Sequence, residues 1–170
     1  MLSFLVAILA GSSAVADSRP SSLPGLFEAA CLDGQAKLGA GEVTQIGFDQ
    51  LPANLQKQLG QPTSGKVWQL NSGGHSYLYL LSYNDARGVS PKVCGLASDA
   101  MDFKAAGDTL EMRMTGSVSP SRTRSAQWLN TKDGYVATAT TADAFKVLQI
   151  SWMSTVDREA AQTQAQLLAN

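Results

Sequence analysis

Histidine and cysteine are scarce in this sequence of 170 residues, which has one histidine, His75, and two cysteines, Cys31 and Cys94. Zinc sites combine several Cys and His ligands at short spacings, and there is no C-x-x-C pair and no H-E-x-x-H run. No D-x-D-x-D run of a calcium-binding loop is present either. Gly39-Ala40-Gly41 lacks the following Gly-Lys-Ser/Thr of a phosphate-binding loop. We therefore expect neither a metal nor another cofactor.

Net charge is also low, because 13 Lys and Arg residues are balanced by 14 Asp and Glu residues, for a formal charge of −1. Proteins that bind nucleic acid concentrate positive charge to contact phosphates, so we expect no nucleic acid partner. Simple adhesion to an anionic membrane is disfavoured for the same reason. Beyond the N-terminal segment, no stretch approaches the roughly 20 apolar residues of a membrane-spanning helix. We expect no transmembrane span after that segment is removed.

The first sixteen residues contain no charged side chain. Leu2 to Ala10 is an apolar run, and Ala14-Val15-Ala16 has the small-x-small pattern of a signal-peptidase site. Residues 1–16 are therefore predicted to be a signal peptide, followed by a polar leader over 17–22. The alternative is an uncleaved membrane anchor, for which the apolar run is short. An exported protein, periplasmic or extracellular, is the expectation.

The two cysteines are expected to form a disulfide in an oxidising compartment. A bridge between Cys31 and Cys94 would close a long loop and contribute up to about 4 kcal/mol on the chain-entropy model. The alternative is a pair of free thiols, one of them reactive, which would act as a redox sensor.

Residues 23–156 are predicted to form a single α+β domain, followed by a C-terminal helix or frayed tail over 157–170. Ser22 can cap a first helix that presents Cys31 inward, and leucines at four-residue spacing predict a second helix over 52–59. A helical turn or two is expected after Ser98, ended by Gly107. Alternation and turn residues predict strands over 66–70, 75–83, 89–97, 110–114, 126–130, 135–141 and 145–153. The expected fold is an antiparallel β-sheet of about six to seven strands with short helices packed on one face.

The strand predicted over 75–83 has an unusual aromatic pattern. By two-residue alternation one face carries His75, Tyr77, Tyr79 and Tyr83. Tyrosine offers a large amphipathic contact area, which favours a binding face for a sugar or a peptide. The other interpretation places this face in the core with the hydroxyls at its rim, because tyrosine is intermediate in burial.

A second candidate surface is the Ser-Arg-Thr-Arg-Ser segment, in which Arg122 and Arg124 could bind an anion or a protein partner. The alternative interpretation is a solvated loop that binds nothing.

Nucleophilic catalysis finds little support in the sequence. Ser76 follows His75 in a run that begins like G-x-S-x-G but has Leu78 in place of the last glycine. The nucleophile elbow also requires a helix after the serine, and here a strand is predicted. Two carboxylates brought together by folding, as in glycosidases, stay possible because they need no linear motif. The acidic residues Asp99, Asp102 and Asp108 are interpreted as helix caps or a solvated face.

The layout resembles a loose group of small exported bacterial proteins without assigned activity. The resemblance covers roughly residues 1–97 and rests on the N-terminal segment, Phe27 and Cys31 on an early helix, Gly47-Phe48 and a later strand with Cys94. It implies a Cys31–Cys94 bridge and an extracytoplasmic location, and it supplies no catalytic residue.

Taken together, the sequence predicts an exported envelope protein without enzymatic activity that acts as a binding or accessory module. Its partner would be an envelope protein, or a small-molecule or glycan ligand. The alternative is a small periplasmic hydrolase that uses carboxylates assembled by the fold.

Overall fold

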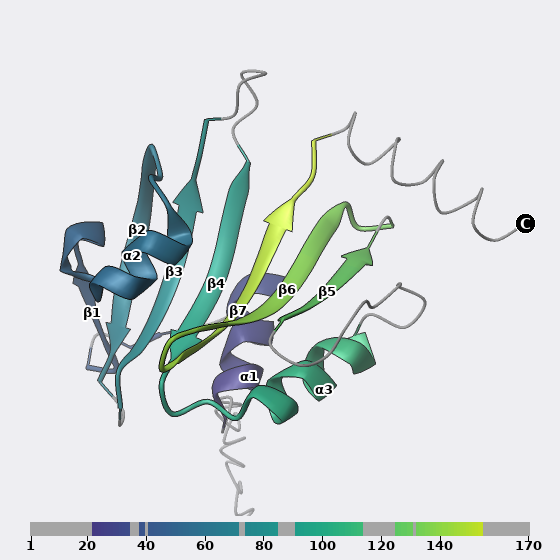
Figure 1. Ribbon diagram of the computed structural model, residues 1–170, viewed down its shortest axis with the longest axis horizontal. Helices are drawn as coiled ribbons and strands as arrows, with labels where there is room; N and C mark the ends of the chain where they lie inside the picture. Colours follow the sequence, from purple (N-terminus) through teal and green to yellow (C-terminus); the bar gives the residue numbers. More distant parts are fainter. Residues whose placement is uncertain are drawn as a thin grey trace, which may run out of the picture.

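The structure is a computed structural model that describes residues 22–34, 38–39, 41–71, 74–84, 91–113, 125–130 and 132–154. Seven strands form one antiparallel sheet in the order β1-β2-β3-β4-β7-β6-β5 (Figure 1). The strands are β1 (Val43–Ile46), β2 (Ser64–Leu70), β3 (Ser76–Ser82), β4 (Lys92–Ser98), β5 (Ser125–Asn130), β6 (Tyr135–Ala142) and β7 (Phe145–Trp152). The antiparallel sheet predicted from the sequence is confirmed.

The helical segments are short. They are α1 (Leu23–Phe27), a π-helix η1 (Glu28–Leu32), a 3-10 turn η2 (Phe48–Gln50), α2 (Ala53–Leu59) and α3 (Phe103–Arg113). The Ser22 side chain caps α1 by accepting from the Gly25 N–H at 3.2 Å, as its position predicts. Within the described residues, no helix has both the length and the hydropathy to cross a membrane.

Each face of the sheet has its own core. The disulfide face carries Leu78, Cys94, Leu96, Leu148 and Ile150 and is covered by α1, η1 and α3. The tyrosine face, defined by Tyr77, Tyr79, Leu81, Val93 and Val147, is covered by α2 and the segment before it, through Leu51, Leu55 and Leu59.

The helices are thus divided between the two faces, which departs from the expected arrangement with all of them on one. The reason lies in β4 at the middle of the sheet, where every residue from Val93 to Ser98 is buried. A strand that is apolar on both faces needs cover on both.

The prediction of a strand over 110–114 is wrong for residues 110–113, which the structure describes as helix. Leu110 lies in α3 and is fully buried together with Ala106, four residues earlier. A helix places residues four apart on one face, so it can bury this pair. Gly107, the expected end of the helix, lies within α3. The seventh strand is instead β1, which the sequence did not suggest.

The predicted disulfide is confirmed: Cys31 of η1 is bonded to Cys94 of β4, with 5.5 Å between their Cα atoms. The bond joins the first helical segment to the centre of the sheet across 63 positions of sequence. The predicted signal peptide, the leader and the C-terminal tail lie outside the described residues, Ser22 excepted.

Candidate functional site

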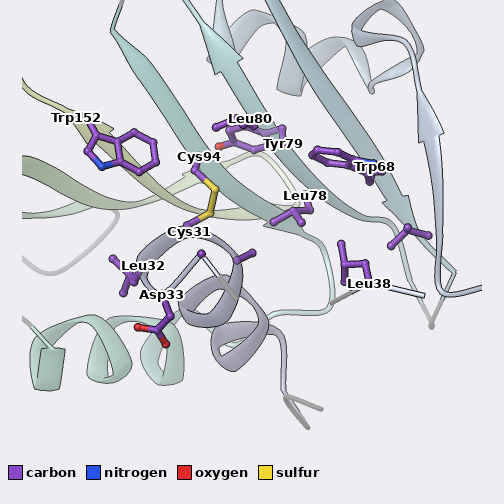
Figure 2. A pocket seen from close by; sticks show the side chains of 13 residues that line it. Cys31, Leu32, Asp33, Leu38, Trp68, Leu78, Tyr79, Leu80, Cys94 and Trp152 are labelled. Atoms are coloured by element: carbon purple, nitrogen blue, oxygen red, sulfur yellow. A yellow bond between two sulfur atoms is a disulfide. The ribbon is translucent and has the colours of Figure 1, made fainter. Parts of the chain in front are cut away.

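A groove of about 650 Å³ opens on the disulfide face, between η1 and the strands beneath it (Figure 2). Its lining comes from η1 and the residues after it, from β1 to β4, and from the end of β7. The apolar side chains that line it are Leu32, Leu38, Val43, Trp68, Leu78, Leu80 and Trp152, together with the disulfide. This lining makes the groove a predominantly apolar site.

Two side chains make this groove unusual. Leu80 is 41% exposed and Trp152 is 36% exposed, and these are the exposed large hydrophobic side chains among the residues that the structure describes. Both line the same groove. Trp68 of β2, the strand next to that of Leu80, lines it as well. Scattered surface hydrophobics are common, whereas a contiguous exposed apolar surface in a hollow is typical of a binding site.

The groove exists because the helical cover of the disulfide face stops early. Asp33 N–H donates to the Glu28 carbonyl at 2.9 Å, which closes the wide π turn, and Gly34 then takes a φ of 63°. A positive φ favours glycine and ends the helix there. The cover therefore ends just past Cys31, and Leu80 and Trp152 beyond it stay uncovered. Short π-helical turns are frequently found at functional sites.

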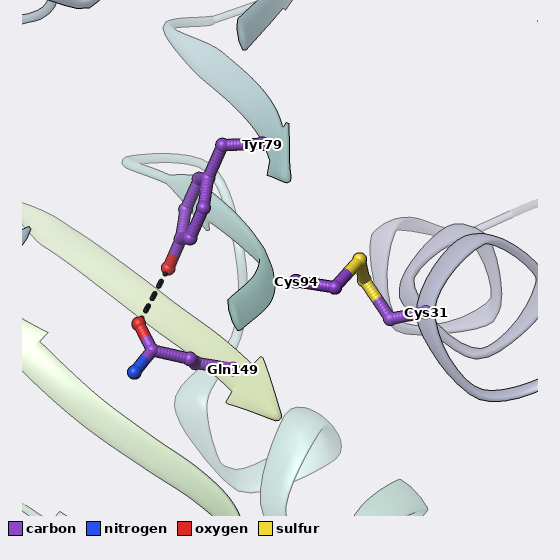
Figure 3. The surroundings of a disulfide bond; sticks show 4 residues. All are labelled: Cys31, Tyr79, Cys94 and Gln149. Atoms are coloured by element: carbon purple, nitrogen blue, oxygen red, sulfur yellow. Dashed lines mark hydrogen bonds between the residues drawn. A yellow bond between two sulfur atoms is a disulfide. The ribbon is translucent and has the colours of Figure 1, made fainter. Parts of the chain in front are cut away.

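The floor of the groove is held rigidly from two sides. The Cys31–Cys94 bond ties η1 to β4 at the floor of the groove. On the opposite side of β4, the Tyr79 hydroxyl donates to Gln149 Oε1 of β7 at 3.0 Å (Figure 3). Tyr79 reaches Gln149 across Gly95, where any Cβ would overlap the tyrosine ring. These two contacts hold the shape of the groove floor.

The tyrosines singled out from the sequence lie in the core. Tyr77 and Tyr79 are buried, and Tyr83 is half-buried, with its hydroxyl donating to the Leu59 carbonyl of α2 at 2.8 Å. Burial raises the pKa of Tyr79 well above its ordinary value and that of Tyr83 to about 12. Tyr77 and Tyr79 therefore lie in the core, as the second interpretation of this face has it, while Tyr83 lies at the rim and is partly exposed.

His75 lies at the exposed start of β3. Asp99 accepts from its backbone N–H at 2.9 Å, and the Asp99 Oδ2 lies 2.9 Å from its ring Nδ1. These hydrogen bonds from His75 lower the pKa of the Asp99 carboxyl. Ser76 points into the disulfide face, where its Oγ lies 2.7 Å from that of Ser98, and both serines are fully buried. A buried serine is not accessible to a substrate, so this cluster does not form a nucleophilic site.

The remaining predicted site residues stay apart from the groove. Arg122 and Arg124 lie outside the described residues. Asp102 accepts from the Lys104 N–H at the start of α3, and Asp108 forms an ion pair with the Lys104 Nζ at 2.6 Å. No group of three His, Cys, Asp or Glu side chains that could hold a metal ion occurs within the described ranges.

The segment after α2 resembles a phosphate-binding loop in its residue spacing. Gly60 to Lys66 has the glycine and lysine spacing of a phosphate-binding loop, with Val67 in place of the final Ser or Thr. In the structure α2 precedes this run and β2 follows it. A phosphate-binding loop needs the opposite order, strand then helix, so that amide groups at a helix N-terminus face the phosphate.

Sequence reasoning did not find the groove, because its residues come from distant segments. Two-residue alternation puts Leu80 on the face of β3 opposite the tyrosines, but its exposure depends on where η1 ends. Comparisons with protein-family models, with curated proteins and with solved structures find no match for this chain.

Proposed function

We propose that this protein is a non-enzymatic binding protein of the bacterial envelope that takes a small molecule with an apolar body into the groove beside the disulfide. The observation that carries the proposal is the position of Leu80 and Trp152. Both are exposed, and both line one apolar hollow of about 650 Å³.

The size and chemistry of the groove support a small ligand. Small-molecule sites are concave and mostly apolar, with volumes of about 300–1,000 Å³. A ligand bound against Leu80, Trp152 and Trp68 removes their apolar surface from water. This burial stabilises a complex by about 25 cal/mol per Å² buried. Export accords with this role, because a disulfide is stable in an oxidising compartment.

The described part of the groove does not favour a hydrolase. Its lining contains one carboxylate, Asp33. Hydrolysis by the glycosidase mechanism needs two carboxyl groups on either side of the scissile bond. Binding without chemical conversion is therefore the function that these residues support best.

The proposal is tested with a neutral naphthylamine dye whose fluorescence rises in apolar surroundings. The wild-type protein should bind the dye, and Leu80→Asn or Trp152→Ala should weaken binding about five- to tenfold, because apolar contact surface is lost.

The matched control is Leu129→Asn, which makes the same chemical change on the opposite face of the sheet, in β5. Its dye affinity should equal that of the wild type. Equal affinity in all three variants, with thermal unfolding unchanged, would contradict the assignment of the groove.

A further inference from the structure

Two lysines lie beside the lining of the groove, on the disulfide face. In the β2–β3 ladder Lys66 pairs with Leu80, so both side chains lie on the disulfide face. Lys92 pairs with Ser82, and it precedes Val93, which pairs with Ser151, so Lys92 lies beside Trp152. Side chains on one face of neighbouring strands are about 5 Å apart at their Cβ atoms. The register thus places one ammonium group next to each exposed apolar residue of the groove.

Both lysines are exposed, and within the described ranges neither forms an ion pair. The carboxylate that lines the groove, Asp33, lies on the η1 side and points away from Leu80 and Trp152 (Figure 2). The positive charge is local, because the chain as a whole has a formal charge of −1. Among the described residues, two positive side chains therefore flank a groove whose lining is mostly apolar.

We infer that the groove binds a single-chain anionic amphiphile, a long-chain carboxylate, with its alkyl chain along Trp68, Leu80 and Trp152 and its head group at Lys66 and Lys92. The inference rests on the proposed function and names the ligand class for that same groove. The apolar lining explains affinity for the chain, and charge complementarity with Lys66 and Lys92 explains preference for an anionic head.

The head-group contribution is separated from the chain contribution with a pair of probes. Dodecanoate and dodecanol, which share the same alkyl chain, are each used below the concentration at which they aggregate to displace the neutral naphthylamine dye. Dodecanoate should bind about fivefold or more tightly than dodecanol at low salt, since exposed ion pairs contribute about 0.2–1 kcal/mol each. The preference should shrink as salt is added, because exposed charges are screened.

The variant that tests the assignment is Lys66→Glu combined with Lys92→Glu. It should lose the preference for dodecanoate while its affinity for dodecanol and for the dye stays at the wild-type value. Lys57→Glu is the control, because it reverses one lysine charge on α2, on the opposite face of the sheet, and should keep the full preference.

The outcomes separate the two proposals. Equal displacement by dodecanoate and dodecanol in the wild type, or a preference that survives in the double variant, would overturn the ligand class and leave the groove as a neutral apolar site. Binding to vesicles of anionic phospholipid without uptake of free dodecanoate would overturn it in favour of a membrane surface. Failure of the wild type to bind the neutral dye would overturn the proposed function itself.

Discussion

The two faces of the sheet carry similar apolar residues but differ in how completely helices cover them. On the tyrosine face, Leu55 and Leu59 of α2 cover the central strands, and Tyr79 is completely buried. On the disulfide face, α1, η1 and α3 cover the centre, yet Leu80 and Trp152 stay exposed at one end. The difference shows that exposure here follows from the length of the covering helix and not from the hydrophobicity of the strand.

The two faces also differ in what holds their cover in place. On the tyrosine face it is helix packing and the hydrogen bond from Tyr83 to Leu59. On the disulfide face, the packing of Phe27, Ala106 and Leu110 is supplemented by the covalent bond at the floor of the groove. A short helical segment with few buried residues, such as η1 with Cys31, gains little from packing alone, and the disulfide compensates for this.

Removal of the disulfide should have the largest effect. Replacing Cys31 and Cys94 with serine should lower the free energy of unfolding by up to about 4 kcal/mol and weaken dye binding, since η1 is no longer tied to the floor of the groove. Urea unfolding and dye titration measure the two effects. Unchanged stability in the double variant would show that the bond has no structural role.

A matched pair of leucines compares the faces directly. Leu55→Ala should cost about 3 kcal/mol, because the side chain is fully buried beneath the tyrosine face and leaves a cavity. Leu80→Ala should cost less than about 1 kcal/mol, because its side chain is 41% exposed. Chemical denaturation of both variants checks this order. Equal losses would mean that the groove is closed in solution.

Gly95→Ala tests the packing across β4 that supports the floor of the groove. The added methyl group would overlap the Tyr79 ring, so we expect a loss of about 1–3 kcal/mol in unfolding free energy. Combining it with Tyr79→Leu, which removes the overlapping ring atoms, should recover part of that loss relative to the sum of the single changes. Additive losses would contradict the contact.

The smallest expected effect concerns alkaline pH and the tyrosine face. The folded pKa of Tyr83, about 12, lies above its ordinary value of 10.0. The stabilisation of the neutral phenol is therefore fully present below pH 10 and is lost as the pH rises toward 12. In Tyr83→Phe, urea unfolding followed between pH 9 and about pH 12 should show a shallower decline than in the wild type. An identical decline would mean that Tyr83 does not contribute.

Local sequence patterns predicted those elements whose causes are local. Ser22 caps α1, Leu55 and Leu59 lie on one face of α2, and Gly60 ends that helix with a φ of 74°. The strands that flank tight turns were also predicted. The start of α3 before Gly107 was predicted as a helical turn, but its extension over 108–113 was not. Leu110 and its neighbours alternate in a way that suits a strand, while packing against β5 and β6 selects a helix.

The sequence by itself determined the alternation within the strands and the Ser22 cap, and it favoured the pairing of its two cysteines, since each follows from residues near one another or from a count of two. Only the tertiary structure decided which face of the sheet each helix covers. It also decided that β7 lies between β4 and β6 in the sheet. The groove, too, was decided by the tertiary structure. Leu80, Trp152 and the two lysines meet through strand register and through the point at which η1 ends, and both depend on contacts between distant parts of the chain.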